Sequence, residues 1–224
     1  MTASGVVKRV GSPLLFGVAF LGVWELIVMA FDIAPFTLPA PSAIWTAFIE
    51  RFDQVLEETL VTGKNALIGF LLGIVFGVLM SLLTVRFVGV ESLLTPLAVA
   101  VNAIPIVVIV PILNNMLFGT TSQVPRRLMV MLIVFFVVFI NVSKGLRQVS
   151  ATHLELMRSY AATPWEILLK VRAPNAVGYL FTAMRIAAPL AVITAFVAEY
   201  FGGVQSGLAT GVRNSLNGSK DVTW

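Results

Sequence analysis

The sequence predicts an all-α membrane protein, a polytopic bundle of transmembrane helices with one polar helical loop. The chain has 224 residues, of which 58% are hydrophobic and only 12% are charged. Soluble domains are ~45–50% apolar and ~25% charged, so this chain has too little charge to cover a soluble globule. Its apolar residues also gather in long runs, and a helix needs ~20 of them to cross a hydrocarbon core of ~30 Å.

Five apolar runs predict membrane spans, at residues 13–31, 66–84, 92–113, 128–142 and 176–198. Strands of a membrane barrel would be shorter and would alternate apolar with polar residues. The first run could be the core of a signal peptide, but such cores are ~7–15 residues long and lack acids. This run is longer and holds Glu25. We therefore expect a cytosolic N-terminal segment over 1–12 and a single membrane domain over 13–224.

Basic residues predict the orientation, because cytosolic loops carry an excess of Lys and Arg. With the N-terminus in the cytosol, eight of these residues lie inside and six lie outside. The inner group includes every Lys and Arg between the fourth and fifth spans, and the outer group includes Arg126 and Arg127. The segment between spans four and five is therefore expected in the cytosol.

A row of small residues follows one face of the second span. Gly69, Gly73 and Gly77 are spaced by four, and Ser81 continues the row. Residues four apart share a helix face, and a face without side chains lets another helix approach closely in a bilayer. The row fits either a contact within the bundle or an interface with a second subunit.

Prolines and charges interrupt other spans. The third run holds Pro96, Pro105 and Pro111, and irregular backbone at membrane depth is tolerated where it is buried in protein or lines a water-filled cavity. This span is thus either a pathway helix or a bent packing helix. Glu25 and Arg185 are costly within apolar runs. We expect these two to pair with each other or with another partner in the bundle, or Arg185 to face the pathway and favour an anionic solute.

The segment 148–174 is too polar to span the membrane and too patterned for a loose loop. Thr152 and Glu155 fit a capping box at a helix start, and Thr163 and Glu166 fit a second box with Pro164 at the first helical position. Two short helices meeting near residue 162 are predicted. A tight helix pair can read DNA, but tethers to the membrane at both ends favour a docking element for a cytosolic partner.

Motifs for chemistry are missing from the sequence. It has no cysteine and a single histidine, His153, and its net charge of +4 is scattered. It contains no G-x-x-x-x-G-K-[ST] phosphate loop and no H-E-x-x-H metal motif. We therefore expect no catalytic site, no cofactor, no metal and no nucleic-acid partner. If transport uses ATP, a separate chain must hydrolyse it.

Residues of the cytosolic segment also follow a known spacing. Glu155 and Pro174 match the pattern E-A-A-x3-G-x9-I-x-L-P, Ala161 stands at its glycine, and Val171 and Ala173 replace its isoleucine and leucine. The segment thus resembles the coupling loop of the membrane subunit of binding-protein-dependent ABC importers. Further motifs resemble the nitrate, sulfonate and taurine branch: Trp24-Glu25, residues 38–42, Gly69-Phe70, Pro105 with Pro111, Phe118-Gly119 and Ala198-Glu199.

The resemblance implies a bacterial inner-membrane permease that works as a pair of identical or sister subunits. It implies two cytosolic ATPases, an extracytoplasmic solute-binding protein, and import of a small anion or a pyrimidine-like vitamin precursor. The residues expected to couple to the ATPase are Glu155, Ala161, Thr163, Pro164, Trp165, Glu166 and Pro174. A sixth span is expected beyond about residue 220, so either the sequence is truncated at Trp224 or the family pattern is incomplete here.

Two other functions fit a membrane bundle without chemistry. A stand-alone secondary transporter or channel would commonly show internal repeats, and none is visible between the halves of the sequence. A membrane scaffold without transport is the third hypothesis. An ATPase and a secreted binding protein encoded beside this chain would favour the importer.

Overall fold

A computed structural model describes residues 3–87, 104–113, 122–202 and 206–214, with single positions or short stretches at 89, 92–94, 96–97 and 100. Within these residues the regular elements are helices and no strand occurs. The predicted all-α class is therefore confirmed. The chain divides into two compact units, residues 1–58 with 210–224 and residues 59–209.

The first unit contains α1 (Ala3–Ala30), α2 (Pro41–Glu50) and the start of α3 (Phe52–Arg86). Pro41 occupies the first turn of α2, where its missing N–H costs nothing and its fixed φ suits a helix. The stretch between the first two predicted runs, residues 32–65, is thus largely helical.

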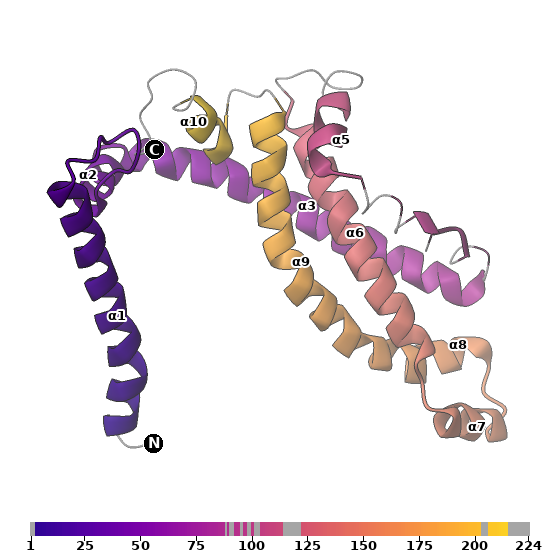
Figure 1. The fold of residues 1–224 in the computed structure, drawn as a ribbon. Coiled ribbons are helices and arrows are strands. Elements are labelled where there is room, and N and C mark those ends of the chain that lie inside the picture. The colour runs from indigo at the N-terminus through magenta and orange to yellow at the C-terminus, as the bar shows by residue number, and fades with distance from the viewer. Residues whose placement is uncertain are drawn as a thin grey trace. The chain divides into compact units, whose positions relative to one another are not determined.

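The second unit holds the rest of α3 and the helices drawn from magenta to orange in Figure 1. These are α5 (Ile106–Leu113), α6 (Val124–Arg147), α7 (Ala151–Ser159), α8 (Pro164–Ile167), the π-helical turn η2 (Leu168–Arg172) and α9 (Ala173–Phe201). A short helix, α10 (Leu208–Asn214), follows α9.

Four helices in the described residues are long and apolar enough to cross a membrane. They are Gly11–Ala30, Phe52–Val85, Val124–Arg147 and Pro164–Phe201, and they include most or all of the first, second, fourth and fifth predicted runs. The last three extend well beyond those runs because helical hydrogen bonding continues into the polar flanks. The third predicted span lies only partly within the described residues, where α5 forms its end with Pro111 inside the helix.

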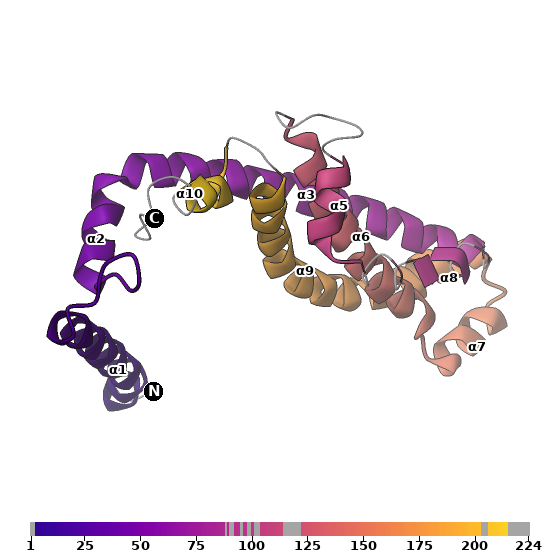
Figure 2. The same cartoon turned by 45° about the horizontal axis from the view of Figure 1, so that its top comes forward.

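The core of the second unit lies between α6 and α9, which pack side by side in both Figure 1 and Figure 2. The α6 side of this core is Val130, Val134, Val138, Val142 and Leu146. The α9 side consists of alanines, at 176, 183, 187, 191 and 195. Small residues on one helix let the other approach closely, which is how helices gain packing energy in lipid.

The glycine row of α3 faces α6 in the same chain. Each glycine lies against one valine: Gly69 against Val130, Gly73 against Val134 and Gly77 against Val138. One turn further on, Ser81 Oγ donates a hydrogen bond to the Phe139 carbonyl of α6 at 3.1 Å. The row therefore makes a close helix–helix contact within the bundle.

Candidate functional site

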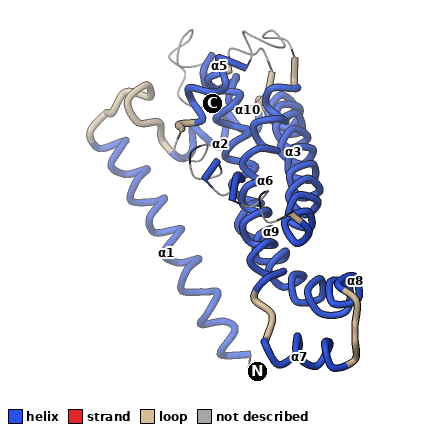
Figure 3. Tube along the Cα trace, turned by 90° about the vertical axis from the view of Figure 1, so that its right-hand side faces the viewer, coloured by secondary structure: helices blue, strands red, loops and turns tan. Residues whose placement is uncertain are grey.

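The coupling segment, residues 148–174, forms one end of the second unit, where a turn joins α7 to α8 (Figure 3). α7 begins at Ala151, with Ser150 as its N-cap and no side-chain cap hydrogen bond. The capping box predicted at Thr152 and Glu155 is therefore wrong. Ser150 has a non-helical ψ of 133° and directly precedes the first helical residue, so Thr152 already lies in the first turn and cannot serve as the cap.

The second predicted capping box is confirmed. The Glu166 N–H donates to Thr163 Oγ1 at 3.3 Å, and the Thr163 N–H donates to Glu166 Oε2 at 2.9 Å. Pro164 occupies the first turn as predicted. Glu166 also forms an ion pair with Lys170 Nζ at 3.2 Å, one turn later. All these contacts are local, so the start of α8 is determined by residues close to it in the sequence.

Ala161 follows the C-cap of α7 and adopts a left-handed conformation, with φ of 51°. The Ala162 N–H donates to the Met157 carbonyl at 3.0 Å and the Ala161 N–H to the Arg158 carbonyl at 2.9 Å. This pair of bonds is a Schellman motif, and its left-handed position usually holds glycine because glycine has no Cβ. The geometry thus gives a physical reason for a glycine at this place in the coupling pattern.

Two helices meet near residue 162 as predicted, but the second is not a separate short helix. α8 runs through η2 directly into α9, and the Ala173 N–H donates to the Leu168 carbonyl five residues back. The next residue, Pro174, has no N–H and would clash with the carbonyl four residues earlier in a regular helix. The π-turn ends just before this proline, and the second helix is an extension of the membrane-spanning helix.

The coupling segment presents apolar side chains outward. Trp165 is 65% exposed, and Leu156 and Leu169 are about half exposed. Glu155 is also exposed, on α7. A large exposed tryptophan, with exposed leucines in the same segment, is typical of a protein-binding surface.

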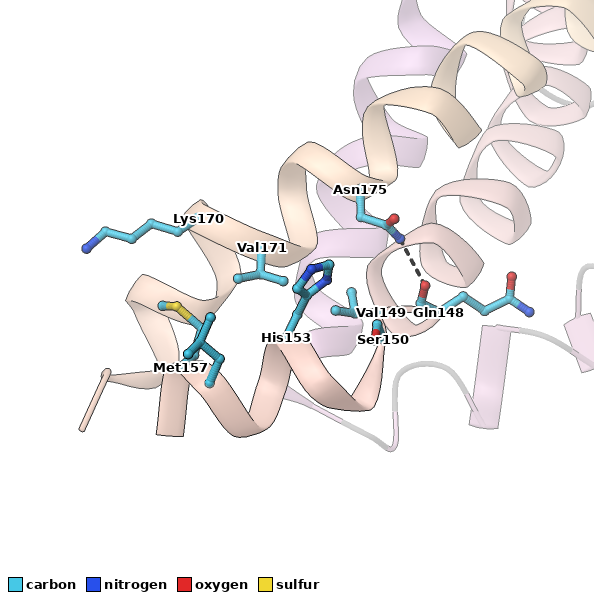
Figure 4. A pocket seen from close by; sticks show the side chains of 9 residues that line it. Gln148, Val149, Ser150, His153, Met157, Lys170, Val171 and Asn175 are labelled. Carbon is cyan, nitrogen blue, oxygen red and sulfur yellow. Dashed lines mark hydrogen bonds between the residues drawn. The ribbon is translucent and has the colours of Figure 1, made fainter. Parts of the chain in front are cut away.

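A cavity of about 520 Å³ lies between α7 and the π-turn. His153 and Met157 line it from α7, and Lys170 and Val171 line it from η2 (Figure 4). At its inner edge, Asn175 Nδ2 donates to the carbonyls of Gly145 at 2.7 Å and Gln148 at 3.1 Å.

The base of α9 is fastened to the end of α6. Besides the bonds of Asn175, the Tyr179 hydroxyl donates to Gln148 Oε1 at 2.7 Å. The Tyr179 ring and Ala176 also lie so close to Gly145 that a side chain there would clash with them. The coupling segment is therefore attached to two spans at once, through α6 before it and α9 after it.

Glu25 has a local structural role in the first unit. Its Oε1 accepts from Ser42 Oγ at 2.6 Å, and its Oε2 accepts from the Ser42 N–H at 3.0 Å. Ser42 is in the first turn of α2, so the carboxylate lies at the positive end of that helix. These contacts tie α1 to α2.

Other candidates from the sequence are not brought together. Arg185 is exposed on α9 and forms no hydrogen bond or ion pair with the described part of the chain. It belongs to a different unit from Glu25. Pro105 directly precedes α5 and is exposed, Pro111 is partly buried within α5, and Phe118-Gly119 lies outside the described residues.

A buried polar cluster that sequence reasoning missed lies at the other end of the bundle. Arg126 and Glu199 are fully buried and Asn65 is 1% exposed. Glu199 Oε2 accepts from Thr62 Oγ1 at 2.7 Å, and Thr62 Oγ1 accepts from the Leu208 N–H at 2.9 Å. The cluster thus joins α3 and α9 to the start of α10.

Gln123 and Asn65 connect the cluster to α6. Gln123 Oε1 accepts from Asn65 Nδ2 at 2.7 Å and from Arg126 Nη1. Arg127 Nε donates to Asn65 Oδ1 at 3.0 Å. In the sequence these residues stand at the polar ends of apolar runs, where solvent exposure is the usual outcome, so only their proximity in the fold reveals the cluster.

Comparison with known proteins identifies the family. Residues 69–220 match the family described as binding-protein-dependent transport system inner membrane component. A "Probable ABC transporter permease protein" of Haemophilus influenzae is 29% identical, over 87% of this chain and 78% of its own length. A formylaminopyrimidine transport permease of Halalkalibacterium halodurans is 31% identical, over 85% and 75%.

The resemblance to the nitrate and sulfonate branch also stands. A nitrate import permease of Leptolyngbya laminosa is 23% identical, over 84% of this chain and 69% of its own length. Relatives named for bicarbonate and for aliphatic sulfonates are each 26% identical. The chain therefore belongs to the binding-protein-dependent transport system inner membrane components, the multi-pass permease subunits of ABC transporters.

Proposed function

We propose that this chain is the permease subunit of an importer that moves a small solute into the cytosol while separate subunits hydrolyse ATP. The exposed apolar surface on the coupling segment carries this proposal. Trp165 and Leu169 face outward from a helix that is continuous with a membrane span. A partner that binds there can pull directly on α9.

The coupling segment transmits movement because of how it is attached. Asn175 and Tyr179 bind the base of α9 to the end of α6, so a force on α8 reaches two spans. The Schellman turn at Ala161 sets the direction of α7 relative to α8. We place this segment in the cytosol, as the basic residues favour, with the N-terminus on the same side.

The importer is completed by other chains. We infer a second permease subunit, identical or a sister chain, two cytosolic ATP-binding subunits and an extracytoplasmic solute-binding protein in the bacterial inner membrane. Relatives are named for formylaminopyrimidine, riboflavin, nitrate, bicarbonate and sulfonates. The solute is accordingly a small anion or a pyrimidine-like compound.

Co-purification with the candidate ATPase tests this proposal. Trp165→Ala removes the largest exposed apolar side chain of the coupling segment, and a tryptophan at a binding hot spot contributes at least about 2 kcal/mol. We expect roughly a thirtyfold loss of ATPase affinity, since 1.4 kcal/mol corresponds to a factor of ten. Membrane insertion should not change.

Trp45→Ala is the matched control, because Trp45 is 64% exposed on α2, outside the coupling segment. It should retain the ATPase. Equal ATPase binding by wild type and Trp165→Ala would refute the docking role of this helix.

A further inference from the structure

One edge of a buried arginine has no hydrogen-bond partner. Arg126 lies in the first turn of α6 and is 0% exposed. Its Nη1 donates to Gln123 Oε1, whereas Nε and Nη2 have no acceptor in the described part of the chain. These two nitrogens form the side of the guanidinium that binds two oxygens in parallel. Leaving such donors buried and unpaired is costly, so this edge is built to take a partner.

Charges around this edge favour an anion. Arg127 is adjacent and close enough to act on Arg126 electrostatically, and both stand at the positive N-terminal end of α6. Cations are disfavoured at a helix N-terminus, so two of them there need compensation. Glu199 also acts electrostatically on Arg126. Arg126 thus has one neighbouring carboxylate, one neighbouring cation and a position at a helix N-terminus.

Glu199 does not occupy the free edge. Its Oε2 accepts from Thr62 Oγ1 at 2.7 Å, and its carboxylate also accepts from the Ala209 N–H. Gly207 lies next to this carboxylate and has a φ of 106°. A side chain at residue 207 would collide with the Glu199 carboxylate. The Glu199 carboxylate is therefore fixed by Thr62, Ala209 and Gly207, and the Nε–Nη2 edge of Arg126 is left for another group.

We propose that the Nε–Nη2 edge of Arg126 binds the solute when that solute is a small oxyanion: nitrate, bicarbonate, a carboxylate or a sulfonate. Each offers two oxygens to a guanidinium edge. This inference rests on the proposed function and narrows its solute class. Because the same cluster joins α3, α6 and α9 through Thr62, Gln123 and Glu199, an oxyanion bound there acts on the packing of all three helices.

Ligand-dependent thermal unfolding tests the site in the assembled complex of this chain with its ATPase, in lipid nanodiscs. Sodium nitrate, bicarbonate, formate and methanesulfonate are titrated against sodium chloride at constant ionic strength. We expect saturable stabilisation by at least one oxyanion over chloride. Arg126→Lys keeps the charge but loses the two parallel donors, so its apparent affinity should fall at least tenfold. Arg147→Lys, at an exposed arginine in the last turn of the same helix, is the control and should bind as the wild type does.

Glu199→Gln provides a second test that does not require Arg126 to be changed. It removes the neighbouring negative charge while keeping the shape of the side chain, so oxyanion affinity should rise severalfold. Unchanged or weaker binding in Glu199→Gln would overturn the inference. So would unchanged affinity in Arg126→Lys.

The inference and the proposed function fail in different ways. If the complex assembles, and its ATPase responds to the binding protein, but no oxyanion stabilises it, the Arg126 site is refuted and the importer stands. If no ATPase associates with the chain, the proposed function fails, and the site fails with it.

Discussion

Gly73→Ala tests the close contact between α3 and α6. The added Cβ would lie 2.6 Å from Val134 Cβ, 2.7 Å from Val134 Cγ1 and 2.8 Å from the Met131 carbonyl oxygen. Ordinary contacts begin at 3.4 Å. The carbonyl is backbone and cannot turn aside, so α6 must retreat by roughly 1 Å, a gap that forfeits much of the dispersion energy nearby.

The expected cost follows from overpacking. Inserting one carbon into a tightly packed helix contact costs about 1–3 kcal/mol. Gly63→Ala is the matched control on the same helix, because nothing lies within 4 Å of its added Cβ. That change should stabilise the protein by about 0.5–1 kcal/mol, since alanine favours a helix interior over glycine.

The assay is the free energy of unfolding, measured by titrating sodium dodecyl sulfate into the purified chain in mixed micelles. Gly73→Ala should unfold at a lower detergent fraction than wild type, and Gly63→Ala at a higher one. Val134→Gly alone should also destabilise the protein, because Val134 is buried in the α6–α9 core. In the double variant Gly73→Ala with Val134→Gly, the loss should be smaller than the sum of the two single losses, because the Val134 clash is gone. If Gly73→Ala is as stable as Gly63→Ala, the row does not pack against α6 and the reasoning is refuted.

Two further substitutions test local backbone geometry. Ala161→Gly should stabilise the protein by about 1 kcal/mol, because glycine adopts the left-handed conformation without strain; thermal unfolding checks this, and Ala162→Gly should bring no gain. Gly207→Ala should cost at least about 2 kcal/mol, since it combines a φ of 106° with a collision against the Glu199 carboxylate. A normal melting temperature in Gly207→Ala would show that Glu199 is not confined as described.

The membrane fold could be predicted from the sequence because apolar runs and helix length are tied by bilayer thickness. The spacing of the glycine row also predicted a close helix–helix contact, but spacing alone does not say which helix packs against the row. The valines of α6 could not be paired with the glycines in advance, since any helix with a suitable ridge would serve. The partner is settled by three-dimensional packing.

A helix N-cap could be predicted only where the residues around it are compatible with a single backbone conformation. Thr163, Pro164 and Glu166 define a helix start without ambiguity, whereas Thr152 tolerates a helical conformation, so α7 begins earlier. The π-turn before Pro174 was missed because a proline in a polar segment usually ends a helix. The cluster of Arg126 and Glu199 was missed because their closeness depends on long-range folding.

ATP-driven uptake into proteoliposomes tests the central claim most directly. This chain, its candidate ATPase and the solute-binding protein are reconstituted, and uptake of radiolabelled solute is followed with and without ATP. The importer assignment predicts uptake only when all three proteins and ATP are present, with loss of uptake in Trp165→Ala. Uptake by this chain alone, driven by an ion gradient and independent of ATP, would contradict the account.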